Sequence, residues 1–326
     1  MPSEVTLQIN LSGGDVSYAE TTVPPLVAAH RATVREVLGV VDCVRPQRTQ
    51  MVDPDVRFPP DRFNERCARI RSIAEKFVHE GTFDRVVYVE PGDPRTRALL
   101  TRYAGWPVVE THDCYGCGLV SYLYGFDEAR TRYLLHYDAD MLLHQAVGYD
   151  WSVEGLEHLS KDPRAISATP RVSPPFARVL GTRDSPSLQA AHPALEPHGA
   201  VWHIGWFSAR CFLLDLERLR HWLPLLSARR PRYFGEVCAR RILARGYPPA
   251  VEVLIHLRAK GQGAYRVDLV TEKAFVVHPN NKDERFLRML PGMLDAIRSG
   301  AVPAGQRGWE NVILEAWEGF AGVAAT

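Results

Sequence analysis

Apolar positions in the first 143 residues follow two alternating periods. Alternating or continuous apolar runs predict strands at 5–11, 37–44, 84–90 and 107–110 and in the run that ends at Asp138. Apolar residues at helical spacing predict helices at 25–35, 62–79, 95–103 and 118–129. Strands that alternate with helices are typical of a mostly parallel sheet covered by helices on both faces. We therefore expect an α/β fold.

The second half of the chain has a mixed pattern. It predicts strands at 165–169, 211–215, 251–255 and 274–277 and helices at 153–159, 234–245, 286–297 and 309–320. Residues 170–199 carry six prolines, and so long a connection is typical of a functional lid or of a disordered segment. Neither an internal repeat nor a linker is visible, so we expect a single domain over residues 1–326.

Composition narrows the class of protein. Hydrophobic residues make up 46% of the 326 residues and charged residues 24%, which is the balance of a globular protein with a sizeable core. The net charge of +1 argues against nucleic acid or an anionic membrane as a partner. No apolar stretch is long enough to span a bilayer, and the first residues do not resemble an export signal. A cytoplasmic location is the expectation.

Six cysteines are scattered along the chain, and we expect reduced thiols rather than a disulfide framework. Cys114 and Cys117 have the spacing of a redox or zinc pair, with His112 and Asp113 beside them. Because no second such pair exists, small buried thiols next to a glycine turn are the favoured interpretation.

The run 133–143 carries the strongest chemical signal. An apolar strand ends in Asp138 and Asp140, and apolar residues resume at once. Residues two apart on an extended backbone point to the same side, so both carboxylates are able to share one hard cation. Magnesium typically takes one or two protein carboxylates plus substrate phosphates. The alternative is an ordinary turn after a strand, where aspartate is also common.

Another acid stands at a strand end upstream. Glu90 closes the run 84–90, and in parallel sheets ligands bind beyond the carboxyl ends of the strands. Asp93 follows in a turn, so it is a candidate nucleoside contact or plain turn chemistry. Neither a complete P-loop nor a dinucleotide-binding glycine fingerprint is present, so those two classes of site are not expected.

Several short segments, in order, resemble the motifs of one enzyme family. They are 86–93, the glycine segment 116–118, the Asp-x-Asp of 138–140, the glycine loop 205–208, the acidic helix start 234–236 and His278 after the last strand. The chain is similar in this respect to glycosyltransferases of the GT-A fold, nearest the family-2-like group. The resemblance covers roughly residues 84–282. At the acceptor motif the chain departs from the family, because Glu236 is a single acid followed by Val237.

The resemblance implies a Rossmann-like GT-A domain with a nucleotide-binding half (1–145), an acceptor-binding half (146–282) and C-terminal helices (283–326). It implies a metal-dependent glycosyltransferase that moves a sugar from a nucleotide-sugar donor, expected to be UDP-linked, to a small soluble acceptor. The cofactor would be Mn²⁺ or Mg²⁺, with Asp140 and His278 as direct ligands and Asp138 as a ligand through water or a contact to ribose. Donor contacts would come from Glu90, Asp93, Asp138, Gly205, Trp206 and Lys282, and Glu236 would be the general base of an inverting transfer.

Alternatives stay open on the sequence. Glu236 is also an acid favoured at a helix N-terminus, and Trp206 is as well suited to the core as to a sugar face. A nucleotidyltransferase acting on a sugar phosphate would also need paired aspartates, but the loop 12–15 lacks its basic residue. A non-catalytic nucleotide-sugar-binding protein is the third possibility. The arginine-, alanine- and proline-rich composition is associated with enzymes of secondary metabolite biosynthesis, and a homo-oligomer is compatible with the sequence.

Overall fold

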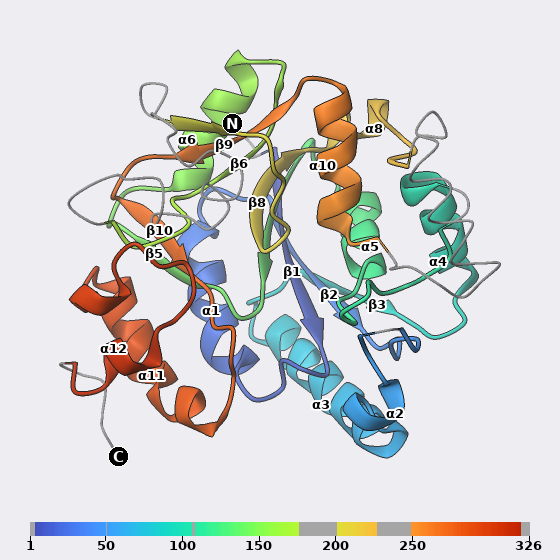
Figure 1. Cartoon of the computed structure of the whole chain (residues 1–326), viewed down its shortest axis with the longest axis horizontal. Coiled ribbons are helices and arrows are strands. Elements are labelled where there is room, and N and C mark those ends of the chain that lie inside the picture. The colour runs from blue at the N-terminus through green and yellow to red at the C-terminus, as the bar shows by residue number, and fades with distance from the viewer. Residues whose placement is uncertain (1–3, 50, 106–107, 176–200, 227–248, 321–326) are drawn as a thin grey trace.

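A computed structural model describes residues 4–49, 51–105, 108–175, 201–226 and 249–320 (Figure 1). Its main sheet has eight strands in the order β3-β2-β1-β4-β8-β6-β9-β7. The strands are β1 (Val5–Ser12), β2 (Glu36–Asp42), β3 (Arg85–Val89), β4 (Tyr133–Asp138), β6 (Ala165–Thr169), β7 (Val201–Ile204), β8 (Cys211–Asp215) and β9 (Tyr265–Leu269). The expected α/β sheet is confirmed.

Strand direction divides the sheet into two halves. β3, β2, β1 and β4 are mutually parallel, whereas β8 is antiparallel to both β4 and β6 and β7 is antiparallel to β9. The sheet is therefore mostly parallel and becomes mixed in the second half of the chain, as predicted. A separate two-stranded antiparallel sheet is formed by β5 (Leu142–Gln145) and β10 (Ala274–Val277). In the chain, β5 begins just after the Asp138–Asp140 segment.

Helices cover both faces of the main sheet. Side chains of α1 (Ala19–His30), α3 (Pro60–His79), α6 (Trp151–Lys161) and α11 (Glu284–Arg298) share one core cluster. A second cluster contains α4 (Pro94–Leu99), the π-helical turn Leu100–Ala104, α5 (Val120–Glu128), α8 (Leu216–His221) and α10 (Val251–Gly261). Side chains of a strand alternate between the two faces of the sheet. In β2, Val37 and Val41 therefore belong to the first cluster, whereas Leu38 and Val40 belong to the second. Short helices α2 (Pro54–Arg57) and α12 (Leu314–Trp317) complete the described elements.

Three predicted elements were wrong, and some observed strands were missed. Residues 251–255 begin helix α10 rather than a strand, and the strands β5, β7 and β9 were not predicted. The described residues 108–110 form no strand, and the helix predicted at 309–320 is reduced to the single turn of α12. The first helix starts at Ala19, six residues before the predicted start, and contains Pro24 and Pro25. The helix predicted at 234–245 and most of the proline-rich segment lie outside the described residues.

Candidate active site

A cavity of about 410 Å³ opens where the carboxyl ends of three parallel strands meet. Asn10 of β1, Asp42 of β2 and Asp138 of β4 all line it, and the parallel register places Asn10 beside Asp138. Loops after these strands, the first turns of α3 and Lys282 complete the wall. This is the edge at which ligands bind in open α/β sheets, and the volume lies within the range of small-molecule sites.

Asp138 is the last residue of β4 and is held by two neighbours. The Tyr122 hydroxyl donates to Asp138 Oδ1 at 2.9 Å, and Nε2 of the buried His136 lies 3.1 Å from the same oxygen. These contacts orient the carboxylate toward the cavity that Asp138 lines.

The two-stranded sheet of β5 and β10 brings Asp140 and His278 together. β5 pairs with β10 so that Val277 lies opposite Leu142, which brings the next residue, His278, toward the start of β5 and Asp140. His278 Nε2 is 3.5 Å from Asp140 Oδ2, and Lys282 Nζ forms an ion pair with the same oxygen. Burial alone would raise the pKa of Asp140, but hydrogen bonds and charges from His278 and Lys282 outweigh it and lower the pKa to about 2.

The C-terminal segment fixes the backbone of His278. The His278 N–H donates to the Glu310 carbonyl at 2.8 Å, and the Val312 N–H donates to the His278 carbonyl at 2.9 Å. Gln306, fully buried, holds this segment in shape by donating to the Trp309 and Asn311 carbonyls and by accepting from the Ile313 N–H and Trp317 Nε1. His278 is therefore clamped between β10 and residues 306–312.

The donor set suits a hard divalent cation. Asp140 Oδ1 is buried and has no hydrogen-bond partner in the described part of the chain, which leaves an oxygen available for a ligand. Carboxylate oxygens with one imidazole suit Mn²⁺ or Mg²⁺ ions that keep waters or phosphate oxygens as their other ligands. Among the described residues, no three His, Cys, Asp or Glu side chains are gathered closely enough to hold a metal alone. A metal ion bound here would therefore need ligands from water or from a bound substrate to complete its coordination shell.

Asp42 is a cavity residue that the sequence reasoning missed. It ends β2, is buried, and its Oδ2 has no hydrogen-bond partner among the described residues. Burial raises the pKa of Asp42 to about 7, and the Val44 N–H that donates to Oδ1 offsets this only in part. The signal was visible, since the apolar run 37–41 ends in an acid just as the run before Glu90 does.

Asp15 and Tyr18 form a second polar group in the wall. The Tyr18 hydroxyl donates to Asp15, whose other oxygen accepts from the backbone and side chain of Ser12. Burial raises the pKa of Asp15 to about 6, with the nearby Asp140 charge adding to the rise and the Tyr18 hydrogen bond opposing it. The cavity thus collects four acids from the strand ends and their loops.

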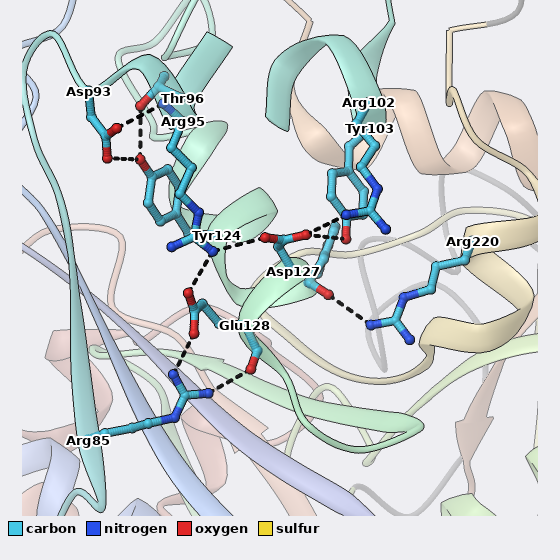
Figure 2. A network of polar contacts seen from close by, with 11 residues as sticks. Arg85, Asp93, Arg95, Thr96, Arg102, Tyr103, Tyr124, Asp127, Glu128 and Arg220 are labelled. Carbon is cyan, nitrogen blue, oxygen red and sulfur yellow. Dashed lines mark hydrogen bonds and ion pairs between the residues drawn. The ribbon is translucent and has the colours of Figure 1, made fainter. Parts of the chain in front are cut away.

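Glu90 and Asp93 lie outside the cavity as the described residues form it. Glu90 follows the edge strand β3 and pairs with Arg71 of α3 at 2.6 Å. Asp93 caps α4 through the Arg95 N–H and accepts from Tyr124 OH at 2.8 Å. Figure 2 shows Asp93 next to a network of arginines around Asp127 and Glu128, in which Arg95 bonds Asp127 at 2.9 Å. Both acids have structural partners where they stand.

Gly205 and Trp206, two residues predicted to contact the nucleotide-sugar donor, lie beside α10. The Gly205 carbonyl accepts from His256 Nδ1 at 2.6 Å, and the Trp206 ring lies 4.5 Å from that of His256. Neither Gly205 nor Trp206 lines the cavity formed by the described residues, whereas Lys282 does. Glu236 lies outside the described residues.

Glu252, in the first turn of α10, is an acid that the strand prediction concealed. Its Oε1 accepts from the Ala209 N–H at 2.9 Å, and the next residue, Arg210, accepts the Asp138 N–H at 2.9 Å through its carbonyl. Burial raises the pKa of Glu252, and the charge of Asp138 adds to the rise. Glu252 is therefore a half-buried carboxyl close to the Asp138 end of β4.

All five described cysteines are free thiols, as expected. Cys114 and Cys117 are not the buried pair predicted, because Cys114 is half-buried and Cys117 is exposed and lines the cavity. Asp113 accepts from the Tyr115 and Cys117 N–H groups, so the segment is a tight loop at the rim of the cavity. Its thiols hold no metal cluster with the described residues around them.

No described helix is both long and apolar enough to cross a membrane. No protein-family model matches the sequence, and a comparison with curated proteins finds no match.

Solved structures similar to the chain include three that contain nucleotide or sugar ligands. GalNAc-T7 with UDP, GalNAc and Mn²⁺ shares 11% identity over 84% of this chain and 43% of its own, with a TM-score of 0.44. S. aureus TarS 1–349 with UDP-GlcNAc shares 10% over 90% of this chain and 66% of its own, with a TM-score of 0.38. The galactosyltransferase LgtC with donor and acceptor sugar analogues shares 12% over 80% and 72%, with a TM-score of 0.34. The chain thus spans less than two thirds of the first two proteins, and its function is inferred from its own site.

Proposed function

We propose that this protein transfers a sugar from a nucleoside-diphosphate sugar, UDP-linked, to a hydroxyl group of a small soluble acceptor. The proposal rests on one observation: Asp140, which contacts His278 and Lys282, lines the same cavity as Asp42. One oxygen of each of these two carboxylates is buried and has no hydrogen-bond partner among the described residues. One such oxygen suits a cation at the diphosphate, and the other suits a donor group of the nucleoside.

The nucleotide would lie across the strand ends. Asp42 Oδ2 is placed to accept from an N–H of the base or a ribose hydroxyl, and Asn10 lines the same cavity. The diphosphate would be neutralised by Lys282 and by Arg62 and Arg66 of α3, which line the same cavity. Glu90 and Asp93 stay predictions for the nucleoside, but the geometry favours Asp42 in that role.

Departure of the nucleoside diphosphate requires stabilisation of negative charge. A Mn²⁺ or Mg²⁺ ion held by Asp140 and His278 would supply Lewis-acid stabilisation of that charge. Asp138, oriented by Tyr122 and His136, would contact the ion through a water molecule or bind a ribose hydroxyl. Lys282 would add a hydrogen-bonding positive charge on the phosphate oxygens.

The acceptor hydroxyl must lose a proton as it attacks. Glu252 is the described carboxyl that best fits the role of general base, because it is half-buried, has a raised pKa and stands near Asp138. Glu236 remains a predicted base from the sequence. With one carboxylate activating the acceptor on the face opposite the leaving group, the transfer would invert the anomeric centre.

A nucleotide panel tests this proposal. Thermal unfolding of the full chain is measured with UDP, GDP or ADP, each with and without Mn²⁺, and we expect the largest rise in Tm with UDP plus Mn²⁺. Asp140→Asn should abolish the metal-dependent part of the rise. Glu157→Gln, which removes one charge on the exposed face of α6, should leave it intact. Indifference to all three nucleotides would overturn the proposal.

Turnover separates the enzyme from its alternatives. We expect release of UDP from UDP-sugars, and no pyrophosphate from UTP plus a sugar phosphate. Nucleotide binding without either product would identify a non-catalytic binding protein, and pyrophosphate release would identify a nucleotidyltransferase.

A further inference from the structure

Lys282 pairs with Asp140, the carboxylate that a cation at this site would bind. Its Nζ pairs with Asp140 Oδ2, the oxygen that also faces His278 Nε2 at 3.5 Å. The same Nζ lies over the Tyr18 ring, 5.5 Å from its centroid, so an aromatic face also supports the ammonium there. The Asp140 side chain is 9% exposed and that of Lys282 is 30% exposed. The carboxylate is thus buried beneath a lysine that reaches the cavity.

An ammonium and a divalent cation bound to the two oxygens of one carboxylate repel each other. Buried carboxylates are paired or coordinate metals because an unpaired buried charge is costly. In this structure the pairing role belongs to Lys282, while Oδ1 stays without a partner in the described part of the chain. A divalent ion that binds Oδ1 and His278 would place two positive charges near Lys282, which favours departure of the ammonium.

We propose that Lys282 is a resident counter-ion of Asp140 that a divalent cation displaces, and that the displaced ammonium then binds the donor diphosphate. The second half of this exchange rests on the proposed function, whereas the first half concerns metal alone. The lysine stem is flexible and its head already reaches the cavity, so a rotation of the side chain is enough to move the charge from Asp140 to a phosphate oxygen.

This exchange at Lys282 would couple the binding of the metal ion to the binding of the nucleotide. While Lys282 is paired with Asp140 it competes with the metal, so the metal binds weakly in the absence of nucleotide. A diphosphate offers the ammonium another partner and removes the competition. By linkage, each ligand then strengthens binding of the other.

Mn²⁺ binding to the full chain tests the first half. Electron paramagnetic resonance of free Mn²⁺ gives the affinity without nucleotide for the wild type, Lys282→Met and Lys282→Arg. We expect Lys282→Met to bind Mn²⁺ about fivefold tighter, and Lys282→Arg to stay close to the wild type. Lys273→Met is the matched control, because Lys273 Nζ also lies 5.5 Å from a tyrosine ring, that of Tyr149, but outside the cavity.

Three results would overturn the proposal that Lys282 and the divalent cation compete for Asp140. They are equal Mn²⁺ affinity in the wild type and Lys282→Met, an equal gain in Lys273→Met, and no Mn²⁺ binding by any variant. Circular dichroism and thermal melting of each variant establish that a changed affinity is not a loss of fold.

UDP titrations with Mn²⁺ present, read by calorimetry, test the second half. We expect Lys282→Met to bind UDP about tenfold more weakly than the wild type and Lys273→Met to bind it equally. Unchanged UDP affinity in Lys282→Met would overturn the transfer of the ammonium to phosphate. Absence of UDP binding in every protein would overturn that half together with the proposed function, while the Mn²⁺ result would still decide the competition at Asp140.

Discussion

Gly118 lies directly against the carboxylate of Asp42. A Cβ on Gly118 would stand 2.6 Å from Asp42 Oδ2 and 2.8 Å from Ser121 Oγ, so the loop passes this carboxylate with no room for a side chain. Gly118 and Asp42 both line the cavity. The absence of a side chain at 118 therefore sets the shape of the cavity around the oxygen that is proposed to meet the nucleoside.

Gly118→Ala should weaken nucleotide binding more than it weakens the fold. The atoms that the new methyl group meets are the ends of side chains, so they can move, at a cost of about 1 kcal/mol in the free energy of unfolding. Movement of Asp42 should lower UDP affinity about tenfold in calorimetry. Gly155→Ala, which crowds Ala168 and Leu213 under α6 instead, should leave UDP affinity unchanged. Equal UDP affinity in Gly118→Ala and wild type would contradict the placement of the nucleoside at Asp42.

The raised pKa of Asp42 predicts a dependence of stability on pH. Its carboxyl should titrate near 3.8 in the unfolded chain and near 7 in the folded protein, because burial disfavours the charged form. The folded state then binds the proton more tightly, so this contribution to stability is complete below about pH 4 and is lost as pH rises to about 7. Its size is up to about 4 kcal/mol.

Asp42→Asn isolates that contribution. Urea unfolding at several pH values should show a shallower fall in the free energy of unfolding between pH 4 and 7 for Asp42→Asn than for the wild type. Asp15, whose pKa is raised to about 6, contributes in an overlapping window in both proteins and cancels in the difference. Parallel curves for the two proteins would show that Asp42 does not hold its proton in this way.

Strand order explains why the sequence singled out Glu90, which lies outside the cavity formed by the described residues, and missed Asp42, which lines it. Glu90 and Asp42 each close an apolar strand, so local pattern alone gives them the same claim on a ligand. The difference is that β2 lies inside the sheet, between β3 and β1, whereas β3 is the edge strand. Pairing of strands far apart in sequence decides which strand ends converge, and a single sequence does not display it. Asp138 and Asp140 were found because their spacing is local.

Helix α10 shows a different limit. Its first five residues, 251–255, are rich in β-branched residues, which favours a strand. Its buried positions are Val251, Leu254, Ile255 and Ala259, which is helical spacing that becomes visible over eleven residues rather than five. Tertiary burial of one face outweighs local propensity here. The misread element concealed Glu252, which stands in the first turn of this helix.

Glu252→Gln should lower kcat strongly and leave donor binding intact. Glutamine keeps the oxygen that accepts the Ala209 N–H but cannot take a proton, so a loss of about 10²- to 10⁴-fold in kcat is expected, with KM for the UDP-sugar unchanged. The acidic limb of the wild-type pH–rate profile should also disappear. Glu310→Gln is the comparison, since Glu310 is a more deeply buried acid that pairs with Arg210. A small effect of Glu252→Gln with a large effect of Glu236→Gln would return the role of base to Glu236.

Gln306→Ala should destabilise the protein and loosen the metal site together. The change leaves the Ile313 N–H, Trp317 Nε1 and two carbonyls without the partner they have now, at a cost of about 2–4 kcal/mol in urea unfolding. Because residues 306–312 clamp the backbone of His278, Mn²⁺ affinity should fall by about tenfold even under conditions where the variant is fully folded. Gln262→Ala, at an exposed position after α10, should change neither quantity. A destabilised Gln306→Ala that binds Mn²⁺ as tightly as the wild type would show that His278 does not depend on this clamp, or does not hold the metal.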